Sequence, residues 1–181
     1  MQQLSLLFNF KPMKKVKYLI IALILMGTYH ANAQNGTANA GLNQVLASYL
    51  DIKNALATDN SKLANQKATE FTAALKAVNA GKLDAKQKTT WLAYSEKLRF
   101  DGDHISESQK IDHQREHFTS LSKNMFTVVK ALKANKQVIY QQYCPMKKAS
   151  WLSETMAIKN PYYGKEMLEC GQTKETLKAN P

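Results

Sequence analysis

The stretch IDHQREHFTSLSKNMFTVVKAL, residues 111–132, decides the fold. Its apolar side chains, together with one arginine, recur at intervals of three and four residues over about six turns of helix. The repeating set is Ile111, Arg115, Phe118, Leu121, Met125, Val128, Val129 and Leu132. This spacing puts the set on one face of a helix, so we expect an amphipathic helix that must bury this face against partners.

Three similar stripes precede this segment, and no proline interrupts residues 41–135. They contain Leu42, Val45, Leu46, Tyr49, Ile52 or Lys53 and Leu56; Leu63, Ala64, Ala68, Phe71, Leu75 and Val78; and Leu83, Trp91, Leu92, Ser95 and Leu98. Residues 59–61 (DNS) provide capping residues between the first two helices. Gly81 stands where a C-terminal cap is expected, Asp84 can cap the third helix, and residues 101–108 (DGDHISES) are expected to break or kink it.

Four amphipathic segments joined by short polar breaks predict an all-α fold, an antiparallel four-helix bundle over residues 41–135. Residues 136–173 have little periodicity but many aromatic and sulfur side chains. We therefore expect an irregular C-terminal lobe packed on the bundle as part of the same domain, with at most a short strand at residues 138–140. Residues 34–40 are expected to be a flexible segment before the bundle, and residues 174–181 a tail.

The N-terminal residues have the three parts of a cleavable secretory signal. Lysines in residues 14–17 precede an apolar run at residues 18–26, and a small-x-small triplet (ANA) ends at Ala33. The run is shorter than the roughly 20 residues that span a bilayer, so no stable membrane insertion is expected. Residues 1–33 are predicted to be removed, with Met13 as an alternative start, and the mature protein is predicted to be periplasmic or secreted.

Charge and motifs exclude several classes of function. Removing residues 1–33 takes away four lysines and no acid, which lowers the formal charge from +11 to +7. The remaining lysines are dispersed, so a solvated surface is favoured and nucleic acid is not an expected partner. No nucleophile elbow, HExxH helix or phosphate loop is present, so we expect no enzyme.

The C-terminal stretch contains four sulfur side chains in two groups. Cys144 and Met146 lie two residues apart, and Met167 and Cys170 lie three apart. Thiolates and thioethers are soft ligands that suit Cu(I) better than hard cations. The alternative, equally weighted, is a Cys144–Cys170 disulfide, the usual fate of two thiols in an oxidising compartment.

Histidines offer a second set of ligands. His113 and His117 are four residues apart on the helix predicted at 111–132, beside its apolar stripe. Two imidazoles in this relation can share one metal ion, with His104 a less certain third ligand. The simpler interpretation is a pair of solvated side chains.

The strings QREHF (114–118), VIYQQYCPMKKASWLSE (138–154) and IKNPYYGKEMLECG (158–171) resemble the domain-of-unknown-function (DUF) 3347 family. The resemblance implies an exported helical domain of bacteria such as the Bacteroidetes, found alone or attached to CusB-type adaptors of heavy-metal efflux systems. It implies Cys144, Met146, Met167 and Cys170 as metal ligands, and His113 and His117 with less force. The sequence departs from the fused arrangement, because no adaptor domain is recognised in it, so a carrier or buffer is expected rather than a direct component of an efflux pump.

These patterns predict a periplasmic protein that binds a soft metal ion, Cu(I), as a carrier or buffer without turnover. Its partners are predicted to be the metal ion and an efflux adaptor or other envelope protein. The rival hypothesis is a structural or protein-interaction module of the cell envelope, with its lobe held by the Cys144–Cys170 disulfide.

Overall fold

The computed structural model describes the backbone of residues 30–180 and the side chains of residues 40–180. By contacts, the chain from residue 35 onward forms one compact unit, and this unit contains the hydrophobic core. The signal segment predicted over residues 14–33 lies, except for its last four residues, outside the described part of the chain, so it stays a prediction.

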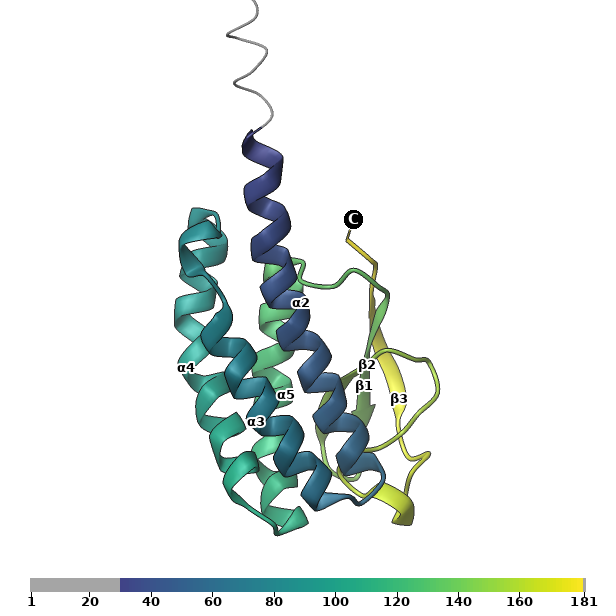
Figure 1. Cartoon of the computed structure of the whole chain (residues 1–181). Helices are drawn as coiled ribbons and strands as arrows, with labels where there is room; N and C mark the ends of the chain where they lie inside the picture. Colours follow the sequence, from purple (N-terminus) through teal and green to yellow (C-terminus); the bar gives the residue numbers. More distant parts are fainter. Residues whose placement is uncertain (1–29, 181) are drawn as a thin grey trace, which may run out of the picture. The chain divides into compact units, whose positions relative to one another are not determined.

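Four helices form most of the described chain (Figure 1). They are α2 (His30–Ala57), α3 (Ser61–Ala77), α4 (Ala85–Glu107) and α5 (Ile111–Leu132). Residues 34–40, expected to be a flexible segment, lie within α2. Short turns join the helices, and all four contribute side chains to one hydrophobic core, as their apolar stripes predicted.

Two of the predicted helix starts have side-chain caps. The Asn60 side chain accepts a hydrogen bond from the Leu63 N–H at the start of α3. Asp84 and Gln87 form a reciprocal capping box at the start of α4. Each cap satisfies N–H groups that the first turn of a helix leaves without partners.

Two local predictions are wrong. Gly81 does not cap α3, which ends at Ala77; the glycine lies in the short 3-10 helix η1 (Ala80–Lys82). Helix α4 is not interrupted at residues 101–107. A side chain at Gly102 would lie 2.8 Å from Thr72 Cγ2, so the glycine permits close packing of α4 on α3 within an unbroken helix.

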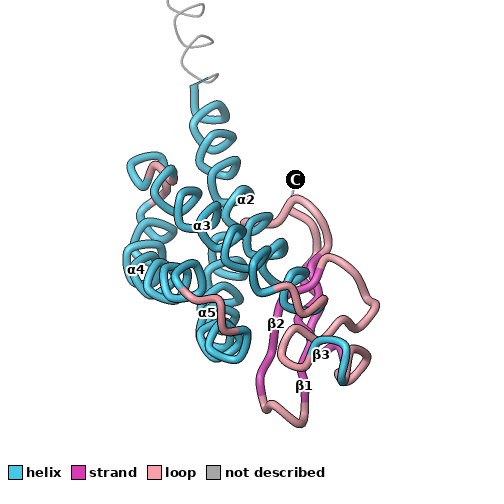
Figure 2. The backbone as a smooth tube through the Cα atoms, turned by 60° about the horizontal axis from the view of Figure 1, so that its bottom comes forward, coloured by secondary structure: helices cyan, strands magenta, loops and turns pink. Residues whose placement is uncertain are grey.

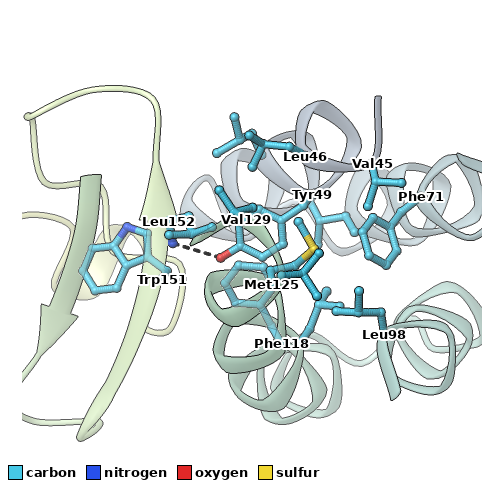
Figure 3. Packing of buried hydrophobic residues seen from close by; sticks show 14 of the residues in the cluster. Val45, Leu46, Tyr49, Phe71, Leu98, Phe118, Met125, Val129, Trp151 and Leu152 are labelled. Atoms are coloured by element: carbon cyan, nitrogen blue, oxygen red, sulfur yellow. Dashed lines mark hydrogen bonds between the residues drawn. The ribbon is translucent and has the colours of Figure 1, made fainter. Parts of the chain in front are cut away.

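The hydrophobic core lies among the helices and extends to the C-terminal lobe. Figure 3 shows Tyr49 of α2 beside Phe118 and Met125 of α5, with Leu152 of the lobe close by. The rings of Tyr49 and Phe118 are stacked with centroids 5.3 Å apart. The backbone N–H of Leu152 donates to the Tyr49 hydroxyl at 3.0 Å, which links the lobe to the helices (Figure 3).

The expectation of an all-α chain with an irregular lobe is wrong for the C-terminal part. Residues after 138 form an antiparallel sheet of strands β1 (Ile139–Cys144), β2 (Ala149–Ser153) and β3 (Gln172–Leu177), in the order β2-β1-β3. Figure 2 shows this sheet beside the helices. Strand β3 takes in residues 174–177 of the predicted tail, because its backbone completes the hydrogen bonding of the central strand β1.

Buried polar contacts attach the lobe to α2. The Lys53 ammonium is 1% exposed and lies 2.8 Å from the Glu154 carboxylate, which also accepts a hydrogen bond from the Asn54 amide at 3.0 Å. A buried ammonium needs such an ionic and hydrogen-bonded partner. The sequence predicted that either Ile52 or Lys53 belongs to the buried stripe of this helix. Both residues are buried.

A second attachment joins α5 to the loop between β2 and β3. The Arg115 guanidinium donates to the Pro161 carbonyl at 2.9 Å and to Asp59 Oδ1 at 2.6 Å. Gly164 has a φ of +55°, and a Cβ there would collide with Asp59 Oδ1 and Arg115 Nη2. Glycine is required in this turn because only a hydrogen atom fits against the ion pair.

Candidate metal centre

The sheet brings the two cysteines together. Cys144 is the last residue of β1, and Gly171 separates Cys170 from the start of β3. Because Tyr143 pairs with Gln172 in the antiparallel register, the chain positions just beyond that pair lie side by side. The two Sγ atoms are 4.0 Å apart, and both thiols are free.

The thiol pair, Cys144 and Cys170, lies at the edge of the core. Cys144 is fully buried, whereas Cys170 is half-buried. The backbone N–H of Lys147 donates to Cys144 Sγ at 3.4 Å. Desolvation, and next the neighbouring Cys144 thiol, raise the pKa of Cys170. Metal binding at this pair must therefore displace protons.

The thioethers are placed less favourably than the thiols. Met146 lies in the turn between β1 and β2 and is 63% exposed, so its sulfur is not enclosed with that of Cys144. Met167 is half-buried at the end of the 3-10 helix η2 (Gly164–Glu166), and its carbonyl accepts from the Cys170 N–H at 3.0 Å. Of the four sulfur atoms predicted as ligands, the structure pairs the two thiols.

The histidines form a separate group. His113 and His117 of α5 lie against each other and against His104 of α4. The ring of His104 also contacts Phe100, and His117 contacts Asp101, both residues of α4. The ligand set predicted from the sequence therefore divides into a thiol pair in the lobe and a histidine cluster on the helices.

Asp101 is a residue of the histidine cluster that the sequence did not identify. It was assigned to a break in the helix, but it is 4% exposed within α4 and lies 3.3 Å from His117 Nδ1. Nothing in its local spacing indicates this contact, because the two residues lie on different helices. Across residues 40–180, no three His, Cys, Asp or Glu side chains are already arranged to hold a metal ion.

The fold and the thiol pair define a class of protein: a helical domain with a small antiparallel sheet that presents paired cysteines. A family model described as "Protein of unknown function (DUF3347)" matches residues 45–137. The chain belongs to this family, as the resemblance had indicated. The matched region takes in the histidine cluster and ends before the cysteines.

No curated protein and no solved structure matches the chain. Within residues 30–180, none of the helices has the length and apolar character needed to cross a membrane.

Proposed function

We propose that this protein binds a soft metal ion, Cu(I), through Cys144 and Cys170 and acts as a carrier or buffer rather than as an enzyme. The supporting observation is the 4.0 Å separation of two free thiol sulfurs. With metal–sulfur bonds of about 2.3 Å, two thiolates on one ion lie roughly 3.8 to 4.6 Å apart, from the tetrahedral to the linear arrangement. The two thiols could therefore bind one metal ion with little movement of the backbone.

The surroundings of the pair favour a soft ion over a hard one. Two thiolates at the edge of the hydrophobic core select Cu(I) over cations that prefer oxygen ligands. Trp151 packs beside the site: a Cβ added at Gly171 would lie 2.8 Å from its Cη2 atom. Met167 is half-buried and joined to Cys170 by a backbone hydrogen bond, so it is the better candidate for a third ligand than Met146, which is exposed.

The setting of this function follows from the predicted signal and the family. Export would put the domain in the periplasm, and the resemblance to domains attached to efflux adaptors makes such an adaptor the proposed partner. The protein would then deliver copper to the efflux system or buffer it.

A competition titration tests the proposal. The purified protein, reduced and kept without oxygen, is expected to hold about one equivalent of Cu(I) against a moderate chelator. The double variant C144S/C170S is expected to lose this binding, and unchanged affinity in that variant would refute the proposal. M146L and M167L measure the thioether contribution, with M156L, at a methionine that is 69% exposed and outside the CPM and MxxC motifs, as the matched control.

A second candidate function is a structural or interaction module held by a Cys144–Cys170 disulfide. The adjacency of the thiols across β1 and β3 also favours this state in an oxidising compartment. A bridge closing this loop would stabilise the fold by about 3–4 kcal/mol in the chain-entropy model. Intact mass after alkylation, with and without prior reduction, separates the two: a two-proton deficit in freshly isolated protein indicates the bridge, and two alkylated thiols support the carrier.

A further inference from the structure

Three histidine rings lie together where α4 and α5 pack against each other. The ring centroids are 4.4 Å apart for His104 and His117, 4.7 Å for His113 and His117, and 6.3 Å for His104 and His113. All three side chains are half-buried, and a shallow surface depression that includes His104 and His113 gives solvent access. Three imidazoles at this spacing have no role in the thiol site.

The spacing suits a shared metal ion. Imidazole nitrogens bind at about 2.0–2.1 Å, which puts each ring centre about 3.2 Å from the ion and neighbouring ring centres roughly 4.5 to 5.5 Å apart. The separation of 4.7 Å lies within this range and that of 4.4 Å just below it, whereas His104 and His113, at 6.3 Å, must move closer together to share an ion. The rings of His104 and His117 are stacked at 28°, so they must turn before their nitrogens converge. The torsion that turns a histidine ring has a broad energy profile, so the turn is a small change.

Two of the rings have an oxygen acceptor beside Nδ1, the nitrogen that would not bind the metal. His117 Nδ1 lies 3.3 Å from the buried carboxylate of Asp101, and His104 Nδ1 lies 2.9 Å from the Phe100 carbonyl. An oxygen acceptor at Nδ1 keeps the proton on that nitrogen and leaves Nε2 with a free lone pair. The Ser120 hydroxyl donates to the same Asp101 oxygen at 2.6 Å, which fixes the carboxylate.

We infer that His104, His113 and His117 form a second metal site, separate from the thiol pair, which takes a divalent ion of borderline softness, Zn²⁺ or Cu²⁺. Imidazole nitrogens select these ions over hard cations, whereas the thiol pair selects Cu(I). Asp101 is a positioning residue for His117. The protein would thus hold two metal ions of different class, one on the helices and one on the sheet.

The test uses the C144S/C170S variant, in which the thiol site is removed. Zn²⁺ is titrated against a chelating indicator, and Cu²⁺ binding is followed by electron paramagnetic resonance. We expect about one equivalent of each ion, nitrogen hyperfine splitting in the Cu²⁺ spectrum, and a loss of affinity of at least tenfold in H117Q and in H104Q. The inference is overturned if neither ion binds stoichiometrically. It is also overturned if the affinity is unchanged in the variant H104Q/H113Q/H117Q.

The positioning role of Asp101 has its own matched pair of variants. D101N is expected to weaken Zn²⁺ binding by about 10- to 100-fold, as removal of an acceptor behind a ligating histidine does. Asp103 lies on the same helix but pairs with Arg99 at 2.8 Å, so D103N should leave the affinity unchanged. In the metal-free protein, the NMR chemical shifts of the His117 ring nitrogens should change in D101N and stay unchanged in D103N. Equal affinities in the two variants would remove the role assigned to Asp101.

Discussion

The helical part of the molecule and its C-terminal lobe are held together in different ways. The helices bury long apolar stripes, with Phe71, Leu98 and Phe118 all at 0% exposure. The lobe also buries apolar residues, but its attachment to the helices includes a few defined polar contacts, among them those of Lys53 and Arg115. The first kind of packing spreads stability over many contacts, whereas the second concentrates it in a few groups.

Two phenylalanines test the contribution of the helical core. F71A removes a fully buried ring of α3 and should lower the free energy of unfolding by about 3–5 kcal/mol, since a cavity remains. F100A removes a ring of α4 that is 55% exposed and should change stability by no more than about 0.5 kcal/mol. Urea denaturation followed by circular dichroism measures both. Similar losses in the two variants would contradict the assignment of Phe71 to the core.

Periodicity predicted the helices because each stripe is a local property of the sequence. Residues 111–132 form α5 with the bounds expected, and the caps at Asn60 and Asp84 follow from the type of residue before each stripe. The sheet was missed because β3 (QTKETL) is mostly exposed and polar, so its pairing with β1 leaves no alternating apolar pattern.

The residues of the candidate sites were likewise predictable only where a local pattern in the sequence indicates them. The cysteine motifs indicated the thiols, and helical spacing indicated the pair His113 and His117. The contact between His117 and Asp101 depends on how α4 packs on α5, which no local pattern reveals. The sequence left open whether the histidines join the sulfur cluster. Phe118 and His117 lie on different faces of α5, because neighbouring residues on a helix point about 100° apart. Phe118 packs against Tyr49 and Tyr162, whereas His117 contacts α4.

Two glutamates test the polar attachment of the lobe. E154Q leaves the Lys53 ammonium, 1% exposed, without an anionic partner. We expect a loss of about 2 kcal/mol, less than the 3–5 kcal/mol of fully buried pairs, because Glu154 is itself 27% exposed and glutamine can still accept a hydrogen bond. The control is E175Q, in which the pair with Lys130 is 53% and 37% exposed and is expected to contribute about 0–1 kcal/mol. Equal urea midpoints for E154Q and E175Q would show that the lobe does not depend on the buried contact.

Acid should also weaken the contact between Glu154 and Lys53. We expect this effect to be smaller than those of F71A and E154Q. Burial acts to raise the pKa of Glu154, but hydrogen bonds from Lys53 and Asn54 outweigh it and hold that pKa below its ordinary 4.5. A carboxyl whose pKa is depressed in the folded state contributes stability above its unfolded pKa and loses it as the pH falls through the folded value. The difference in unfolding free energy between the wild type and E154Q should therefore be constant above about pH 5 and shrink below about pH 4.5.

Urea titrations of both proteins between pH 6 and pH 3 measure this difference. The acid loss shared by the two proteins belongs to other carboxyl groups, Asp59 among them: burial acts to raise its pKa, but the Lys165 N–H and the Arg115 guanidinium outweigh it and lower that pKa. Only the part that disappears in E154Q belongs to the contact with Lys53. A difference that stays the same down to pH 3 would mean that Glu154 acts on the lobe through its shape and hydrogen bonding, and not through its charge.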